Sequence, residues 1–308
     1  MLAGSVRALL VAASVAAAVA VGALSASTPA SSAGGASLEP YAGLGTWVDV
    51  YDRTAWAQPE RVVETMSAYG AATLFLQTSN YRRAEDVVRP DLVARFIAAA
   101  HDRGINVVAW YLPSLAHPAR DLRRALRAIR FRTVDGDGFD SFALDIEARV
   151  VQSPSRRTTS LLQLSSAIRR AVGPSYPLGA IVPSGRRMRL DPGYWPRFPY
   201  RGLARAFDVF LPMTYFAYGA KEARGRADTL EDIGLIRRET KDSAVPIHAI
   251  GGVASLARPS EVTGFASTAF ACGVLGISLY DFVGTSAVQW ATLARATGSA
   301  PAVPTGCR

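Results

Sequence analysis

From Gly43 onward, short apolar runs alternate with amphipathic segments along the chain. We expect strands at residues 45–51, 73–78, 106–112, 141–147, 178–183, 209–215, 246–250 and 276–280. The segments with helical periodicity are residues 59–69, 90–103, 119–130, 157–172, 200–206, 230–242, 259–271 and 286–296. Strands that alternate with helices form βαβ units around a parallel sheet. Eight such units predict an α/β protein with a single closed (β/α)8 TIM barrel. An open doubly wound sheet is the alternative, but no Gly-rich phosphate loop follows the first strand.

The first 33 residues have the layout of a secretory signal peptide followed by a small-residue linker. Arg7 precedes an apolar run over residues 8–24, and small residues follow that run. The run is near the lower length limit for crossing a bilayer, so an uncleaved anchor is the alternative. We therefore expect residues 34–308 to form the barrel domain, and the protein to be secreted or held at the cell surface.

The formal net charge of +9 comes almost entirely from arginine, because Lys221 and Lys241 are the only lysines. The arginine-dense segment over residues 120–132 has apolar residues at positions 122, 126 and 129, which predicts an amphipathic helix with a solvated charged face. An exported chain without a nucleic-acid-binding motif is not expected to bind nucleic acid. An anionic cell wall or polysaccharide is a better partner for this charge.

Two cysteines occur, Cys272 and Cys307. In an oxidising compartment they could form a disulfide that ties the C-terminal tail to the body, and the alternative is two unpaired thiols. The three histidines and two cysteines are widely spread and form no metal-ligand pattern. We therefore expect neither a metal nor a cofactor.

The predicted fourth strand ends in Asp145-Ile146-Glu147. Side chains alternate faces along a strand, so Ala143, Asp145 and Glu147 point the same way. Two neighbouring carboxylates on an apolar strand are costly to bury, and the pair raises the proton affinity of one member. Such a group can act as a general acid near neutral pH. The structural alternative is a buried ion pair with a neighbouring arginine.

Other candidates follow from the rule that barrel enzymes carry their chemistry at the C-terminal ends of the strands. The first strand is expected to present Trp47, Asp49 and Tyr51 on one inward face, which makes Asp49 a third catalytic candidate. Aromatic rings and carboxylates together are typical of a carbohydrate site. The expected substrate-binding residues are Tyr215, Tyr51, Trp110, Gln77, Tyr280, Asp281 and Met213.

Several of these residues also have a structural interpretation. Tyr215 could fill a layer of the barrel, Trp110 could belong to the core, and Asp281 could cap a turn. His248 is expected to be a hydrogen-bonded core histidine. The loop after the fifth strand carries arginines 186, 187 and 189, which could bind an anionic group of a substrate.

The stretch over residues 137–147 resembles the fourth-strand signature of glycoside hydrolase family 18, the chitinase-like barrels, whose pattern is Asp-x-x-Asp-x-Asp-x-Glu. Met213-Thr214-Tyr215 is similar to the sixth-strand Met-x-Tyr-Asp of that family. The resemblance implies that Glu147 is the proton donor and that Asp145 orients the acetamido group of the substrate. It also implies that Tyr215 binds that group, whose carbonyl is the nucleophile.

The chain departs from that pattern at two positions, since Ala143 stands in place of the middle Asp and Phe216 in place of the Asp after the Tyr. A second resemblance is to glycoside hydrolase family 25, the lysozyme-like barrels, which pair a first-strand Asp with Asp-x-Glu on strand four. Asp49, Asp145 and Glu147 match that arrangement. The resemblances imply a secreted glycosidase that cleaves a cell-wall or extracellular polysaccharide, and the alternative is a non-catalytic carbohydrate-binding barrel related to chitinase-like lectins.

Overall fold

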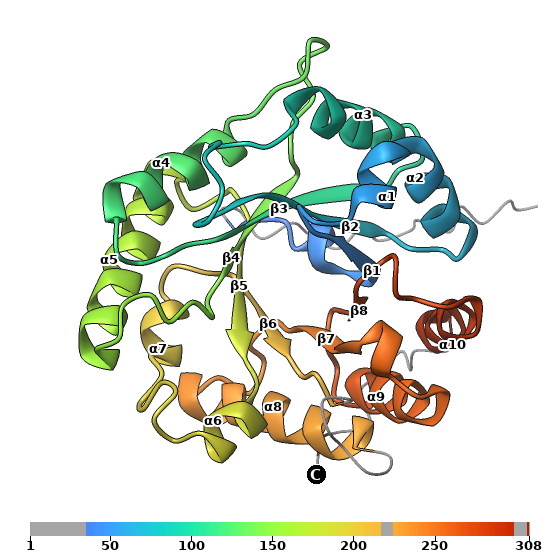
Figure 1. Ribbon diagram of the computed structural model, residues 1–308. Coiled ribbons are helices and arrows are strands. Elements are labelled where there is room, and N and C mark those ends of the chain that lie inside the picture. The colour runs from blue at the N-terminus through green and yellow to red at the C-terminus, as the bar shows by residue number, and fades with distance from the viewer. Residues whose placement is uncertain (1–34, 217–223, 299–306, 308) are drawn as a thin grey trace, which may run out of the picture. The chain divides into compact units, whose positions relative to one another are not determined.

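The computed structural model describes residues 35–216, 224–298 and 307. In this part of the chain, eight parallel strands close into a barrel in sequence order, and β8 pairs with β1 to complete the ring (Figure 1). The strands are β1 (Gly43–Val48), β2 (Thr73–Asn80), β3 (Asn106–Leu112), β4 (Ser141–Asp145), β5 (Leu178–Pro183), β6 (Val209–Met213), β7 (His248–Val253) and β8 (Gly276–Tyr280). The predicted single (β/α)8 barrel is therefore confirmed.

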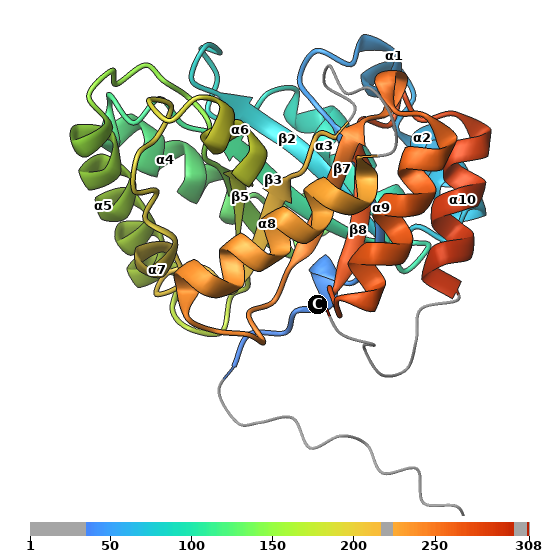
Figure 2. The ribbon, with the colours of Figure 1, turned by 90° about the horizontal axis from the view of Figure 1, so that it is seen from below.

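Helices surround the strands on the outside of the barrel, as the end-on and side views show (Figures 1 and 2). They are α1 (Arg53–Ala57), α2 (Pro59–Ala68), α3 (Pro90–His101), α4 (Pro118–Ile129), α5 (Pro154–Val172), α6 (Gly185–Leu190), α7 (Tyr200–Leu203), α8 (Gly225–Thr240), α9 (Pro259–Ala271) and α10 (Ala287–Gly298), with 3-10 helices η1 (Glu39–Tyr41) and η2 (Ala254–Leu256). Proline stands in the first turn of most of the long helices, where its missing N–H costs no hydrogen bond. The short helices α1 and α6 lie in loops that the sequence pattern did not identify as helical.

The first strand ends three residues before its predicted boundary, at Val48. Beyond Val48, backbone N–H groups donate to side chains. Asp52 Oδ2 accepts from the Asp49 N–H at 3.0 Å, and Asp49 Oδ1 accepts from the Tyr51 N–H at 2.6 Å. These local bonds form a turn in place of further ladder pairing. The prediction that Tyr51 shares the inward face of this strand is therefore wrong, and Tyr51 is 57% exposed.

The fourth and sixth strands are also shorter than predicted, ending at Asp145 and Met213. Glu147 and Tyr215 consequently lie just beyond the strands, in the loops at the mouth of the barrel.

The interior of the barrel is packed with aromatic and branched side chains. Trp47 stacks on Phe75 with ring centroids 4.1 Å apart and meets Trp110 edge-on at 5.7 Å. His248 is fully buried and bonds to the Tyr41 carbonyl at 2.9 Å and to a serine hydroxyl at 3.0 Å, and burial lowers its pKa to about 4. It is the satisfied core histidine that the sequence predicted. A larger core lies between the barrel and the surrounding helices.

Cys272 and Cys307 form a disulfide, with Cα atoms 4.7 Å apart, which confirms the first of the two alternatives for these cysteines. None of the described helices is long and apolar enough to cross a membrane. The predicted signal segment, residues 1–33, lies outside the described residues.

Candidate active site

The Asp-x-Glu pair lies at the mouth of the barrel, with its two carboxyl groups in different surroundings. Asp145 is the last residue of β4 and is only 6% exposed, and its Oδ1 has no hydrogen-bond partner among the described residues. Glu147 lies two residues further and is exposed to solvent. Burial, followed by the charge of Glu147, raises the pKa of Asp145 well above its ordinary value. Because one proton removes the repulsion between the two groups, the pair retains a proton to higher pH than isolated carboxylates do.

Basic side chains moderate this effect at Glu147. Crowding by protein atoms removes part of the hydration of its carboxyl group and raises its pKa, while the charges of Arg187 and then Arg82 lower it. The pKa of Glu147 remains above its ordinary value. A raised pKa on a solvent-accessible carboxyl group is the property that a general acid requires.

The loop after β5 supports the backbone of Glu147. Tyr194 donates a hydrogen bond from its hydroxyl to the Glu147 carbonyl at 2.8 Å. The guanidinium groups of Arg149 and Arg187 lie over the Tyr194 ring, 5.4 and 5.0 Å from its centroid. Both arginines also approach Asp191, at 3.4 and 3.8 Å. This side of the mouth therefore carries one more positive charge than Asp191 neutralises.

The other two arginines of that loop have structural contacts. Arg189 forms a bidentate pair with Glu231, at 2.8 and 2.9 Å, and Arg186 lies 3.9 Å from Asp228. These contacts join α6 to α8. Of the three arginines predicted to bind an anionic group, only Arg187 influences the pKa of Glu147.

A second group of carboxylates comes from β1 and β8. Oxygen atoms of Asp49, Asp52 and Asp281 lie within 4.8 Å of one another. Burial, followed by the charge of Asp49, raises the pKa of Asp52 to about 7, and the same two causes raise the pKa of Asp281. Tyr280 donates from its hydroxyl to Asp49 Oδ2 at 2.5 Å.

Three aspartates this close together could also bind a cation. Most of their carboxylate oxygens, however, already accept hydrogen bonds from protein donors. Asp49 accepts from Tyr51 and Tyr280, Asp52 Oδ2 accepts from the Asp49 N–H, and Asp281 Oδ1 accepts from the Gly284 N–H at 2.8 Å. The arrangement is a hydrogen-bonded carboxylate network, and the expectation that the protein uses no metal stays a prediction.

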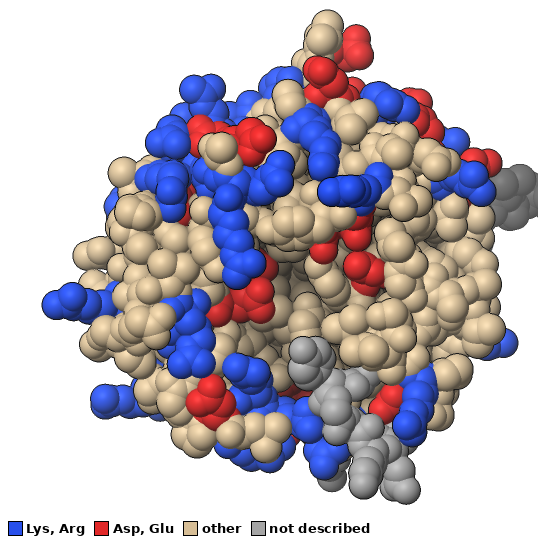
Figure 3. Space-filling model, viewed as in Figure 1, with Lys and Arg blue, Asp and Glu red and all other residues tan. Residues whose placement is uncertain are grey.

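Tyr215 lies between the two groups of carboxylates. Its pKa is raised first by burial and then by four carboxylates, those of Glu147, Asp145, Asp281 and Asp49. Its ring is 6.2 Å from that of Tyr280. The face in Figure 3 is hollowed at its centre, with acidic side chains on two sides of the hollow. The structure thus brings the predicted residues Glu147, Asp145, Asp49, Tyr215, Tyr280 and Asp281 into one site.

Three other predicted binding residues lie deeper. Gln77, Trp110 and Met213 are 2%, 4% and 7% exposed. Gln77 Oε1 accepts from the Val50 N–H at 2.9 Å, and Trp110 donates to a backbone carbonyl at 3.3 Å. They line the barrel beneath the mouth, and their role as sugar contacts stays a prediction. Tyr51 stands at the rim, where its hydroxyl accepts from Asn80 Nδ2 at 3.1 Å.

The sequence did not identify Arg82 or Tyr194 as neighbours of Glu147, and Asp52 was not among the predicted site residues. The spacing Asp49-x-x-Asp52 is visible in the sequence and indicates that both residues belong to the same loop. Nothing in the sequence places Arg82, from the loop after β2, near the end of β4.

Comparisons with known proteins support the fold. No family model matches the sequence, and no curated protein matches it. Among solved structures, the endo-β-1,4-mannanase from Thermotoga petrophila superposes with a TM-score of 0.62 and 10% identity, covering 84% of this chain and 77% of that chain. A glycoside hydrolase family 18 N-acetylglucosaminidase from Paenibacillus barengoltzii superposes with a TM-score of 0.58 and 11% identity, covering 83% of this chain and 99% of that chain. A chitinase-like agglutinin from Robinia pseudoacacia superposes with a TM-score of 0.59 and 13% identity, covering 82% of this chain and 99% of that chain. The chain therefore shares the (β/α)8 fold of these three structures.

Proposed function

We propose that this protein is an exported glycoside hydrolase that cleaves a cell-wall or extracellular polysaccharide, with Glu147 as the general acid. The observation that carries the proposal is the contrast within the Asp145–Glu147 pair. A solvent-accessible carboxyl group with a raised pKa stands beside a buried one whose Oδ1 has no hydrogen-bond partner among the described residues. The Asp145–Glu147 pair lies at the C-terminal ends of the strands, where barrel enzymes carry their active sites.

In the proposed reaction, Glu147 transfers its proton to the glycosidic oxygen as the bond from that oxygen to the anomeric carbon breaks. The leaving sugar departs as an alcohol, and Glu147 is left as a carboxylate. It then accepts a proton from the water that attacks the anomeric carbon. Arg187 and Arg82 stabilise the carboxylate formed in the first step.

An N-acetylated sugar fits the rest of the site. Its acetamido N–H would give the buried Asp145 Oδ1 a hydrogen-bond partner that no described residue provides, and the Tyr215 hydroxyl could donate to the acetamido carbonyl. That carbonyl oxygen would attack the anomeric carbon as the glycosidic bond breaks, and the water would then displace it from that carbon, which restores the acetamido group and leaves a hydroxyl group on the sugar. The alternative, with Asp49 as nucleophile or base, is less favoured because both oxygens of Asp49 already accept hydrogen bonds.

The test is the substitution Glu147→Gln, assayed on N-acetylglucosamine oligosaccharides with Glu64→Gln as the matched control. Glu64 is an exposed residue of α2 whose side chain has no hydrogen bond or ion pair with a described residue. We expect kcat/KM to fall by about 10²–10⁴-fold in the first variant and to stay unchanged in the second. Hydrolysis by Glu147→Gln at the rate of the unmodified protein would exclude Glu147 as the acid. Hydrolysis of de-N-acetylated oligosaccharides at an equal rate would exclude the acetamido route.

A non-catalytic carbohydrate-binding barrel is the second candidate, and Ala143 favours it. Ala143 is fully buried on the same face as Asp145, where it cannot supply the hydrogen bond that a carboxyl group at that position could give. Phe216, which stands in place of the Asp after the Tyr, is also fully buried, and its ring lies 5.6 Å from that of Phe265. Calorimetric binding of the same oligosaccharides without product formation would support this candidate over the enzyme.

A further inference from the structure

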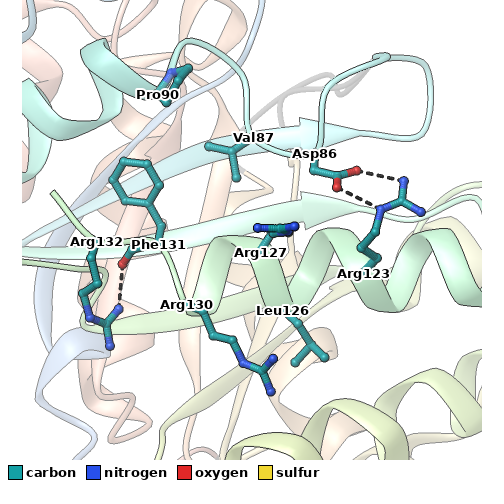
Figure 4. A pocket seen from close by; sticks show the side chains of 9 residues that line it. All are labelled: Asp86, Val87, Pro90, Arg123, Leu126, Arg127, Arg130, Phe131 and Arg132. Atoms are coloured by element: carbon teal, nitrogen blue, oxygen red, sulfur yellow. Dashed lines mark hydrogen bonds and ion pairs between the residues drawn. The ribbon is translucent and has the colours of Figure 1, made fainter.

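An open hollow of about 730 Å³ lies on the outside of the barrel, away from the candidate active-site residues. Asp86 and Val87, from the loop between β2 and α3, form one wall with Pro90, the first residue of α3 (Figure 4). Helix α4 and the residues that follow it form the other wall with Arg123, Leu126, Arg127, Arg130, Phe131 and Arg132. The lining therefore combines an apolar surface with four arginines and one carboxylate.

Two of these arginines have no partner within the described residues. Arg127 and Arg130 are exposed, and neither side chain forms a hydrogen bond or ion pair with a described residue. Arg123 is engaged by Asp86 through two hydrogen bonds of 2.9 and 3.0 Å. Arg132 donates to the backbone carbonyl of Phe131 at 2.6 Å. The hollow thus keeps at least two guanidinium groups available to a ligand.

Arg123 and the two available arginines follow one line along the helix. Arg123, Arg127 and Arg130 are spaced by four and three residues, so they lie on one face of α4. At the rise of an α-helix, these steps are about 6 and 4.5 Å along the axis. A series of cations at such intervals suits a polymer that carries repeated anions better than it suits a single small anion.

A second hollow extends this line toward the mouth of the barrel. It measures about 440 Å³, shares Arg123 with the first hollow, and is also lined by His117, Pro118 and Arg120. Those residues belong to the loop after β3 and the start of α4, at the end of the barrel where the strands finish. The two hollows therefore form a basic track along α4 that begins on the active-site face.

We propose that this track, defined by Arg120, Arg123, Arg127 and Arg130, binds an acidic polysaccharide through its carboxylate groups. The planar fork of arginine pairs with a carboxylate through two parallel hydrogen bonds, and the Arg123–Asp86 pair shows this geometry within the hollow itself. Val87, Leu126 and Phe131 offer apolar surface to the faces of sugar rings. The track holds the protein on its substrate material, and the binding does not depend on whether Glu147 is catalytic.

The test measures binding of the full mature chain to polygalacturonate, with Arg127→Glu/Arg130→Glu as the variant. The matched control is Arg61→Glu/Arg295→Glu, which reverses the charge of two exposed arginines on α2 and α10. We expect the unmodified protein and the control to bind with equal affinity, and the track variant to bind at least about tenfold more weakly. Raising the salt concentration should weaken binding of the unmodified protein more steeply than that of the variant. Circular dichroism confirms that each variant is folded.

Three results would overturn the proposal. The track variant and the control could lose the same affinity, which would indicate a diffuse effect of net charge. A neutral polysaccharide such as galactomannan could bind as well as polygalacturonate, which would remove the role of the carboxylates. Poly(glycerol phosphate) or duplex DNA could bind while polygalacturonate does not, which would assign the track to a phosphate polymer. All of these assays are binding measurements, so failure of the proposed hydrolase activity would leave them unaffected.

Discussion

Tyr280 donates a 2.5 Å hydrogen bond to Asp49 Oδ2 and thereby joins the end of β8 to the end of β1. The two residues are 231 positions apart in the sequence. The bond links the two ends of the strand ring at the mouth, where Asp49 lies beside two other carboxylates. The same two residues therefore contribute to barrel closure and to the electrostatics of the candidate site.

The substitution Tyr280→Phe should destabilise the protein. It removes the hydrogen bond to the Asp49 carboxyl group while keeping the ring, so the free energy of unfolding should fall by about 1.5 kcal/mol. Urea unfolding measures the change. Tyr69→Phe is the control, because the Tyr69 ring stacks on Trp290 and its hydroxyl forms no hydrogen bond with a described residue. An equal loss in the two variants would contradict a specific role for the Tyr280–Asp49 bond.

The substitution Arg187→Ala should move the pH–rate profile of hydrolysis. The positive charge of Arg187 lowers the pKa of Glu147, so its removal raises that pKa. Glu147 must be protonated to act as the acid, and the alkaline limb of the profile should therefore shift to higher pH. Arg189→Ala removes a charge from the same helix, but from a residue paired with Glu231, and should leave the limb in place. An unchanged limb in Arg187→Ala would separate this arginine from the acid.

The substitution Asp52→Asn should reduce the pH dependence of stability. Because the pKa of Asp52 is raised from 3.8 to about 7, the folded state binds the proton more strongly than the unfolded state does. This contribution is fully present below about pH 4 and is lost as the pH rises through about 7. The variant cannot ionise there, so its stability should decline less between about pH 4 and pH 8.

Urea unfolding across that pH range makes the measurement. Asp135→Asn, at an exposed turn residue, is the control and should reproduce the pH dependence of the unmodified protein. A decline as steep in Asp52→Asn as in the control would show that Asp52 ionises in the folded state as it does in the unfolded chain.

The substitution Cys307→Ser should lower thermal stability by removing the disulfide to Cys272. The bond closes a loop of 35 residues, for which the loss of unfolded-state entropy corresponds to about 3–4 kcal/mol. Thermal unfolding with and without a reductant measures the effect. The reductant should lower the melting temperature of the unmodified protein and leave that of Cys307→Ser unchanged. Equal melting temperatures for the two proteins without reductant would show that the bond contributes no stability.

Much of the fold follows from local patterns in the sequence. The strands at residues 106–112, 178–183 and 276–280 have the predicted boundaries, because apolar runs bounded by turn residues specify buried parallel strands. The end of the first strand was predicted three residues too late, because Asp49 and Asp52 accept hydrogen bonds from backbone N–H groups in a way that an apolar pattern does not reveal. The short helix α6 was missed because six residues carry too little periodicity to be recognised.

The sequence by itself determined that the chain forms a (β/α)8 barrel and that Asp145 and Glu147 lie at the end of its fourth strand. Strand period and chain order suffice for both conclusions. Only the tertiary structure decided which groups surround that pair. It placed Arg82 and Arg187 near Glu147, and Tyr215 between two groups of carboxylates, because closure of the barrel brings the ends of distant strands together. Burial and neighbouring charge set the pKa of each carboxyl group, and both depend on contacts between residues that are far apart in the sequence.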